Sequence, residues 1–460
     1  MADSFERLKT TLADRYAIER EPGVRGPATV YSARVKRNRR VALIQRLSPT
    51  LVLATGMICA NCTGRTADAG AWDGVERDSA GIHVVENLGG PTWADGAGWT
   101  MSEIVRIGSV GGDSDYVFGA ISGLAVLSDG RIVVGDGAAR ELRFFSPNGV
   151  HQRTVGRRGS GPGEYNELSG VLVTPGDTLL VPDRRNLRMN RVAPDGTWLE
   201  SQPVSAFEWP VGWSGTPNGL LAAAVGVASY TLIGTEPVPS PVVSLTERGM
   251  IGDTLAWLRP AGFYSQLGGE QFRYYPGEPD FCLLEDGGLV TGHSADYELL
   301  RYSATGALTH VIRLRRERLP ITEREQEVFF SRLKATLQER NRPQRFPQRK
   351  ARTVFTETYP AFRGLVCGPR GTIWVQGFKP WTAISPEEFD RAGIAQLPPA
   401  SPDWDVFDAN GRYLGVVTTP THFDIRLFRD GVAYGVWSDD LGVQYVVGLR
   451  VDGLPAEDVR

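Results

Sequence analysis

The sequence has few of the residues on which several classes of protein depend. Its four cysteines (Cys59, Cys62, Cys282 and Cys367) are too few for a disulfide framework in a chain of 460 residues. The 50 Lys and Arg residues nearly balance the 53 Asp and Glu residues. The resulting net charge of −3 predicts neither nucleic-acid binding nor general adsorption to anionic lipid. With only five histidines, a zinc site made of about three of them is disfavoured.

Glycine and proline are abundant instead. The chain has 54 Gly and 30 Pro but only 22 % charged residues, which favours many turns over long helices. Hydrophobic residues make up 41 % of the sequence, enough to bury a large core.

Turn signals recur along the chain in two alternating classes. Asp-Gly, Asn-Gly and related pairs favour the positive φ angles of tight hairpin turns. The class expected between the first and second strands of each repeat is Asp129-Gly130, Pro175-Gly176, Asn218-Gly219, Gly287-Gly288, Arg370-Gly371 and Asp430-Gly431. The class expected between the third and fourth strands is Asn148-Gly149, Asp195-Gly196, Arg248-Gly249, Thr305-Gly306, Asn410-Gly411 and Asp452-Gly453. Their strict alternation predicts an all-β fold, a six-bladed β-propeller.

An internal match predicts how the ring closes. Residues 107–123 are similar to residues 155–170, which form a fourth strand and the entry into the next blade. No complete blade precedes the first copy, and little chain follows the last turn at Gly453. We therefore expect Glu103–Ile107 to complete the blade that begins at the C-terminal end, which removes two exposed sheet edges.

The repeats resemble the NHL-type six-bladed propellers of bacteria. The resemblance is strongest in the segment SGLAVLSDGRIVVGDGAARELRFFSPNGVHQRTVG, residues 122–156, and extends over about residues 82–453. The third blade, Trp213–Leu258, matches poorly.

Two insertions interrupt the repeats. Between blades four and five, Thr322–Arg340 is expected to be a helix that begins with a capping box of Thr322 and Glu325. Its apolar face is expected to pack against the side of the propeller, with a partner-binding helix as the alternative. The tail after it is basic and reads as a solvated loop, with an anion contact as the alternative: Arg340, Arg342, Arg345, Arg349, Lys350 and Arg352 precede Glu357. The second insertion, Lys379–Pro402 in blade five, is expected to cover one face.

The N-terminal residues 1–46 differ from the rest. Leu12–Leu47 resembles the start of a bacterial Ser/Thr protein kinase N-lobe, with Gly23 and Gly26 in the glycine-rich loop. Arg25 replaces the loop's second glycine, Ile44 replaces the phosphate-pairing lysine, and no catalytic loop follows. We expect a degenerate fragment without kinase activity.

Residues 47–71 have the parts of a secretory signal. A basic cluster (Lys36, Arg37, Arg39 and Arg40) precedes the uncharged segment Leu47–Ala60, and small residues follow at Ala67–Ala71. The apolar segment is shorter than a membrane span of about 20 residues. The sequence thus favours export of a propeller domain, residues 72–460, to the periplasm or beyond. If the internal signal is not used, the protein stays cytoplasmic.

A ligand site in such a propeller is expected at the channel mouth, on the loops that follow the second strands. The candidates in or next to those loops are Asp136, Arg140, Asp183, Arg184, His293, Asp296, Lys379, Trp437 and Asp439. In NHL-type repeats an aspartate in this position commonly binds neighbouring backbone, so a structural role is the competing interpretation. His293 takes the position of that aspartate and is the sharper candidate.

Two functions follow. The first is a monomeric, non-catalytic binding or scaffold propeller for a protein, peptide or glycan, with no nucleic-acid partner and no membrane span in the propeller domain. The alternative is a hydrolase or lyase with a divalent metal at the channel mouth. For that alternative, Asp136, Asp183 and Asp439 offer oxygen ligands for calcium.

Cys282 and Cys367 lie in first strands of adjacent blades, where base rates favour free thiols over a disulfide.

Overall fold

The computed structural model describes residues 72–94, 96–205, 210–225, 239–260, 272–275, 277–385 and 400–454, and the strands β1 and β2. The chain forms two compact units, residues 1–66 and 67–460. In the first, β1 (Tyr16–Arg20) pairs antiparallel with β2 (Tyr31–Val35). The apolar segment Leu47–Ala60 lies outside the described residues. Among the described residues, no helix is long and apolar enough to span a membrane.

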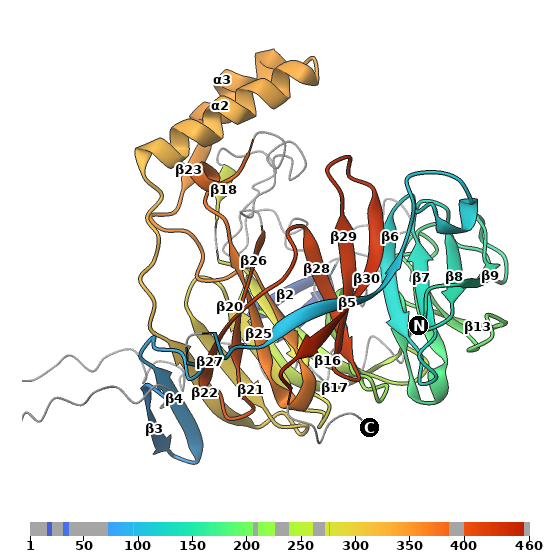
Figure 1. Cartoon of the computed structure of the whole chain (residues 1–460), viewed down its shortest axis with the longest axis horizontal. Coiled ribbons are helices and arrows are strands. Elements are labelled where there is room, and N and C mark those ends of the chain that lie inside the picture. Colours follow the sequence, from blue (N-terminus) through green and yellow to red (C-terminus); the bar gives the residue numbers. More distant parts are fainter. Residues whose placement is uncertain are drawn as a thin grey trace, which may run out of the picture. The chain divides into compact units, whose positions relative to one another are not determined.

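The second unit is a six-bladed β-propeller, as the turn pattern predicts (Figure 1). Blade one contains β6 (Ile121–Val126), β7 (Ile132–Asp136), β8 (Glu141–Phe145) and β9 (His151–Val155). Blade two contains β10 (Leu172–Val173), β11 (Leu179–Asp183), β12 (Arg188–Val192) and β13 (Trp198–Pro203). Blade three contains β14 (Pro210–Gly215), β15 (Leu221–Val225), β16 (Ser240–Leu245) and β17 (Ile251–Leu258).

The remaining blades follow the same antiparallel order. Blade four contains β19 (Pro279–Leu283), β20 (Leu289–His293), β21 (Glu298–Tyr302) and β22 (Leu308–Leu314). Blade five contains β24 (Gly364–Cys367), β25 (Ile373–Phe378), β26 (Ala400–Phe407) and β27 (Tyr413–Thr418). Blade six contains β28 (Phe423–Arg429), β29 (Val432–Ser438), β30 (Gln444–Asp452) and β5 (Thr100–Ile107).

The last blade is completed by the N-terminal strand β5, which confirms the predicted closure. β5 pairs antiparallel with β30 from Thr100↔Asp452 to Ile107↔Val446 (Figure 1). Val105 and Ile107 are buried in a core cluster shared by blades six and one. The pairing thus joins the two ends of the ring through both backbone bonds and apolar packing.

Blade four is wider than the sequence predicts. A hairpin of β3 (Gly74–Ser79) and β4 (Ile82–Asn87) extends it to six strands, with β4 parallel to β22 (Figure 1). Buried Asn87 fixes this addition, because its amide donates to the carbonyls of Arg313 and Gly411 at 3.0 Å. Its Oδ1 accepts from Trp72 Nε1 and from the backbone N–H of Tyr413, both at 2.7 Å. The contacts with Gly411 and Tyr413 cross from blade four to blade five, so the repeat pattern does not predict them.

The third blade is complete although its sequence matches the repeat poorly. Its second strand β15 reads Leu-Ala-Ala-Ala-Val and is wholly buried. Alanine is depleted in strands, so sequence propensity favours no strand here. Burial on both faces stabilises the strand instead.

The first insertion forms most of a small cap with its own core. The cap comprises α2 (Glu323–Glu339), η4 (Pro343–Arg345), α3 (Phe346–Ala351), the parallel pair β18 (Phe272–Tyr274) and β23 (Thr353–Phe355), and η6 (Trp381–Ala383) (Figure 1). Thr322 caps α2 by accepting from the N–H of Glu325, as predicted. The apolar face of α2 is buried, but against these inserted segments rather than the side of the propeller. There Phe329 and Leu333 pack with Trp381.

The cap segments leave the ring between fourth and first strands, or after the second strand β25. Both kinds of connection emerge on the face of the propeller where the second strands end. Glu325 ties two of them together, because its buried carboxylate accepts from the Tyr359 hydroxyl at 2.6 Å and from Thr382. The cap therefore stands on the face where the sequence places a site.

The closing strand generates a stability prediction. Val105→Asp should lower the free energy of unfolding by about 3 kcal/mol or more, because it places an unpaired carboxylate in the core that joins blades six and one. Ile104 on the same strand is 47 % exposed, so Ile104→Asp is the matched control and should cost less than about 1 kcal/mol. Urea unfolding measures both, and equal losses would contradict the role given to β5.

Candidate functional site

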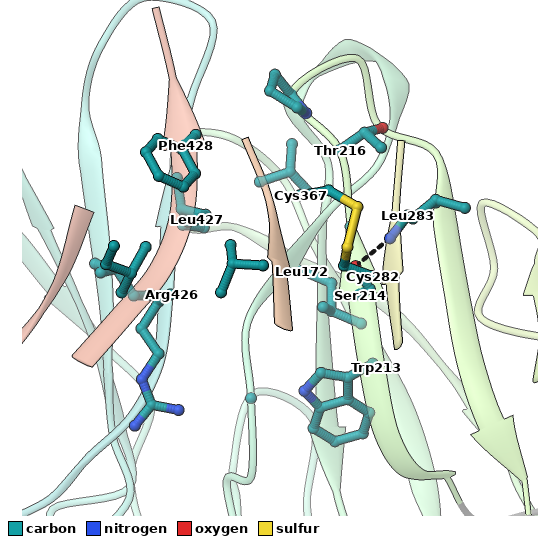
Figure 2. Close-up of a pocket in the computed structure, with 18 of the residues that line it drawn as sticks. Leu172, Trp213, Ser214, Thr216, Cys282, Leu283, Cys367, Arg426, Leu427 and Phe428 are labelled. Atoms are coloured by element: carbon teal, nitrogen blue, oxygen red, sulfur yellow. Dashed lines mark hydrogen bonds between the residues drawn. A yellow bond between two sulfur atoms is a disulfide. The ribbon is translucent and has the colours of Figure 1, made fainter. Parts of the chain in front are cut away.

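A central channel of about 410 Å³ runs between the innermost strands of the six blades. It is lined by β6, β10, β14, β19, β24 and β28, one strand from each blade. These strands belong to different sheets, so backbone ladders do not join them. Side-chain links hold them instead, such as the bond from the N–H of Leu283 to the hydroxyl of Ser214 at 2.9 Å (Figure 2).

Cys282 and Cys367 form a disulfide in the channel wall (Figure 2). The bond joins β19 and β24, the innermost strands of blades four and five, whose cysteine Cα atoms are 5.4 Å apart. The expectation of free thiols is therefore wrong. Adjacent first strands converge at the channel, and this convergence brings together two residues 85 positions apart. The general frequency of free buried thiols does not take this convergence of adjacent strands into account.

One end of the channel is closed by Arg429. Its Nη1 donates to the carbonyl oxygens of Val126 in blade one and Pro217 in the first turn of blade three, at 3.0 and 3.1 Å. The side chain thus spans the channel at the end where the first-to-second-strand turns lie. Because Arg429 obstructs this end, we take the opposite end, on the face that carries the cap, as the open end of the channel.

That open end carries an aromatic and a charged pair. Figure 2 shows the Trp213 indole and the Arg426 guanidinium at one end of the channel, with Phe428 and Thr216 toward the other. The Trp213 ring packs against the backbone of Gly170, where a Cβ atom would lie 2.6 Å from the indole. Arg426 pairs with Asp424 at 3.0 Å, and both side chains are about half exposed.

Asp280 is a site residue that the repeat pattern did not indicate. It lies near the open end of β19 and keeps partial access to the channel but is otherwise enclosed by protein. Its carboxylate accepts from the N–H groups of Leu365 and Phe281 at 2.7 and 2.8 Å. Burial raises the pKa of Asp280 to about 6, which the two backbone bonds only partly offset. Burial also raises the pKa of the neighbouring Glu278.

The predicted rim aspartates have structural roles in the described structure. Asp136 is 1 % exposed and accepts from the backbone N–H groups of Gly119, Ala120, Ala138 and Ala139. Asp183 is fully buried and accepts from the backbone of Asn166 and Glu167. Asp439 accepts from the N–H groups of Leu441 and Val443 in its own turn.

His293 and Asp296 come together with Arg259, a residue that the sequence did not single out. Arg259 Nη2 lies 2.6 Å from Nδ1 of His293 and 2.9 Å from Asp296 Oδ2. His293 Nε2 lies 3.1 Å from the Pro260 carbonyl oxygen, and Nδ1 also accepts from the N–H of Ala295. Burial, reinforced by the Arg259 charge, lowers the pKa of His293. Both ring nitrogens therefore lie within hydrogen-bond distance of protein partners, and burial together with the Arg259 charge disfavours the protonated ring.

The other predicted residues do not converge on one point. Arg140 donates to the carbonyls of Asn166 and Ala138, and exposed Arg184 lies 4.0 Å from Glu167. The Trp437 ring is covered by Arg106, whose guanidinium carbon lies 4.5 Å from the ring centroid. Lys379 directly follows β25 and leads into the cap segment η6.

The predicted calcium ligands are not brought together. Within the described part of the chain, no three His, Cys, Asp or Glu side chains are grouped so that they could hold a metal ion. Asp136 and Asp183 direct their carboxylates at backbone N–H groups of their own blades. The calcium hypothesis based on Asp136, Asp183 and Asp439 is therefore not supported by the geometry.

Comparison with known proteins identifies the fold alone. Residues 112–184, which cover blade one and the start of blade two, match the DUF5128 family, described as a 6-bladed beta-propeller. No curated protein sequence matches the chain.

Several solved structures are similar in fold. A DUF4221 member from Bacteroides vulgatus has a TM-score of 0.49 at 10 % identity, over 77 % of this chain and 98 % of its own. A Bacteroides fragilis protein described as exported has a TM-score of 0.45 at 11 % identity, over 80 % and 99 %. A gluconolactonase from Xanthomonas campestris has a TM-score of 0.38 at 12 % identity, over 72 % and 88 %.

The pKa of Asp280 gives a pH-dependent stability prediction. The unfolded aspartate ionises near pH 3.9, whereas the folded one keeps its proton to about pH 6. The penalty for a buried carboxylate is thus absent below about pH 4 and complete above about pH 7. Over this window the native protein should lose about 3 kcal/mol of unfolding free energy relative to Asp280→Asn, because the folded and unfolded pKa values differ by roughly two and a difference of one corresponds to about 1.4 kcal/mol. Denaturant unfolding of both proteins at several pH values measures this, and a difference independent of pH would contradict it.

Proposed function

We propose that the chain is a non-catalytic binding propeller that works outside the cytoplasm and holds a peptide or glycan at the open end of its channel. The observation that most supports this site is the half-exposed Arg426–Asp424 ion pair at that end, beside the partly buried Trp213 ring, which also packs on the core between blades two and three. Trp213 and Arg426 flank the opening. The carboxylates of the rim aspartates, in contrast, already accept hydrogen bonds from backbone N–H groups.

The chemistry of the opening favours recognition over catalysis. Tryptophan offers a rigid face to a sugar ring or an apolar side chain, and its N–H remains a donor. The Arg426–Asp424 pair is half exposed, and such a pair adds little to stability, so exchanging it for ligand contacts costs little. The metal-dependent hydrolase or lyase lacks a grouped ligand set among the described residues.

Two observations support the extracytoplasmic location. The Cys282–Cys367 disulfide is typical of oxidising compartments and rare in the cytosol. The basic, apolar and small-residue segments between Lys36 and Ala71 have the order of a secretory signal. We also infer that the blades are of the NHL type, that residues 1–46 are a degenerate kinase fragment, and that the propeller is a monomer.

Binding can be tested with an immobilised panel of oligosaccharides and unstructured peptides. Trp213→Ala and Arg426→Ala should each weaken binding of any ligand found by about tenfold or more. Arg158→Ala, at an exposed arginine of blade one, is the control and should not change the affinity. Full affinity in both mouth variants would reject the site, and conversion of a panel member into product would reject the non-catalytic assignment.

Location can be tested by mass spectrometry of the protein from its native host. We expect a mature chain that begins near Trp72 and no alkylation of Cys282 or Cys367 before reduction, because both thiols are joined. A chain that retains residues 1–46, with both cysteines alkylated, would overturn the export proposal.

A further inference from the structure

One short segment of the cap has a charge unlike that of the whole chain. The chain carries a net charge of −3, but residues 340–352 hold six basic residues and no acidic one. They are Arg340, Arg342, Arg345, Arg349, Lys350 and Arg352. Arg340, Arg342, Arg345 and Lys350 are exposed, and Arg349 and Arg352 are half-buried.

The arginines of the blades differ from those of this segment in how often they form ion pairs. Most arginines in the described blades pair with a carboxylate, as Arg77 does with Glu86, Arg131 with Asp129 and Arg450 with Asp452, each within 3 Å. Within the described part of the chain, Arg340, Arg342, Arg345 and Arg352 form no ion pair. Because these four arginines form no ion pair with described residues, their positive charge is not neutralised by partners in the cap.

The segment is held in place rather than loose. Arg349 donates to the Tyr274 hydroxyl at 2.9 Å, and Lys350 Nζ lies 5.2 Å from the Phe330 ring centroid on α2. Phe346 packs against the cap core. These contacts hold η4 and α3 beside α2 and leave Arg340, Arg342 and Arg345 exposed at the α2–η4 junction, in the pair of helices that projects from the ring in Figure 1.

Helix ends explain only part of this charge. Arg340 caps the C-terminus of α2, and Arg349 and Lys350 lie in the last turn of α3, where cations interact favourably with the helix dipole. Arg345 is the N-cap residue of α3, where a cation interacts unfavourably with the helix dipole. Residues 340–345 follow one another closely, within about one Debye length of 10 Å, so their charges act together on a partner.

We propose that this basic surface, formed by Arg340, Arg342, Arg345, Lys350 and Arg352, docks the protein on anionic phospholipid headgroups. Guanidinium groups match phosphate geometry, and several arginines near a surface add their attractions. The helices do not insert, because the apolar face of α2 is buried in the cap core. A nucleic acid is a poorer match, since Phe346 packs into the core and is no stacking platform for bases.

The test is co-sedimentation of the full chain with vesicles of phosphatidylglycerol and phosphatidylcholine, or of phosphatidylcholine alone. All proteins carry Lys36→Gln, Arg37→Gln, Arg39→Gln and Arg40→Gln, so that the N-terminal basic cluster does not contribute. The cap variant adds Arg340→Glu, Arg342→Glu and Arg345→Glu. The control variant instead adds Arg158→Glu, Arg185→Glu and Arg315→Glu, at three exposed blade arginines without ion pairs in the described structure.

We expect binding to the anionic vesicles alone, lost at high salt. The cap variant should bind about a hundredfold more weakly than the parent, and the control variant should bind like the parent. Far-UV circular dichroism verifies that each variant is folded, and the salt dependence of the parent is measured without any variant. Equal binding by the cap and control variants, or binding to phosphatidylcholine alone, would overturn the proposal. Retention by a sulfated polysaccharide without binding to vesicles would also overturn it, in favour of an acidic glycan partner.

Discussion

The pairing of β5 with β30 is the interaction on which the rest of the molecule depends. An open row of six blades would leave an unpaired strand edge at each end, and every innermost strand would lack a fixed neighbour across the axis. Once β5 completes blade six, the channel has a defined width and Arg429 can reach two other blades. The polar links between first strands, such as Asp280 to Leu365, rely on the same closure.

The ring can be predicted from the sequence better than the site can, because turns and helix caps depend on residues that are neighbours in the sequence. Turns need residues that accept positive φ, so Gly130 and Gly149 mark hairpins wherever they occur. The capping of α2 by Thr322 is equally local. The Cys282–Cys367 disulfide, the Asn87 contacts and the burial of Asp280 depend on distances between blades, which no local pattern encodes. The rim aspartates show that position in the repeat does not by itself give a residue's role, because Asp136 accepts hydrogen bonds from its own loop.

The cap and the open end of the channel share one face, so the two proposals concern one side of the molecule. The cap core is joined to the ring through Glu325, Tyr359 and the end of β25 near Phe378. Its basic surface lies on the helices, whereas Trp213 and Arg426 lie within the ring. Docking through the cap would leave the channel's own lining residues unchanged, which allows each proposal to be tested independently.

Closure by the N-terminal strand also determines when the protein can fold. Ser102 and Arg450 touch although they are 348 positions apart, so blade six cannot form until almost the whole chain has left the ribosome. Contacts of such long sequence separation fold slowly and leave strand edges exposed in the meantime. Closure of the ring is therefore the last step of folding and takes place only once both β5 and β30 have been synthesised.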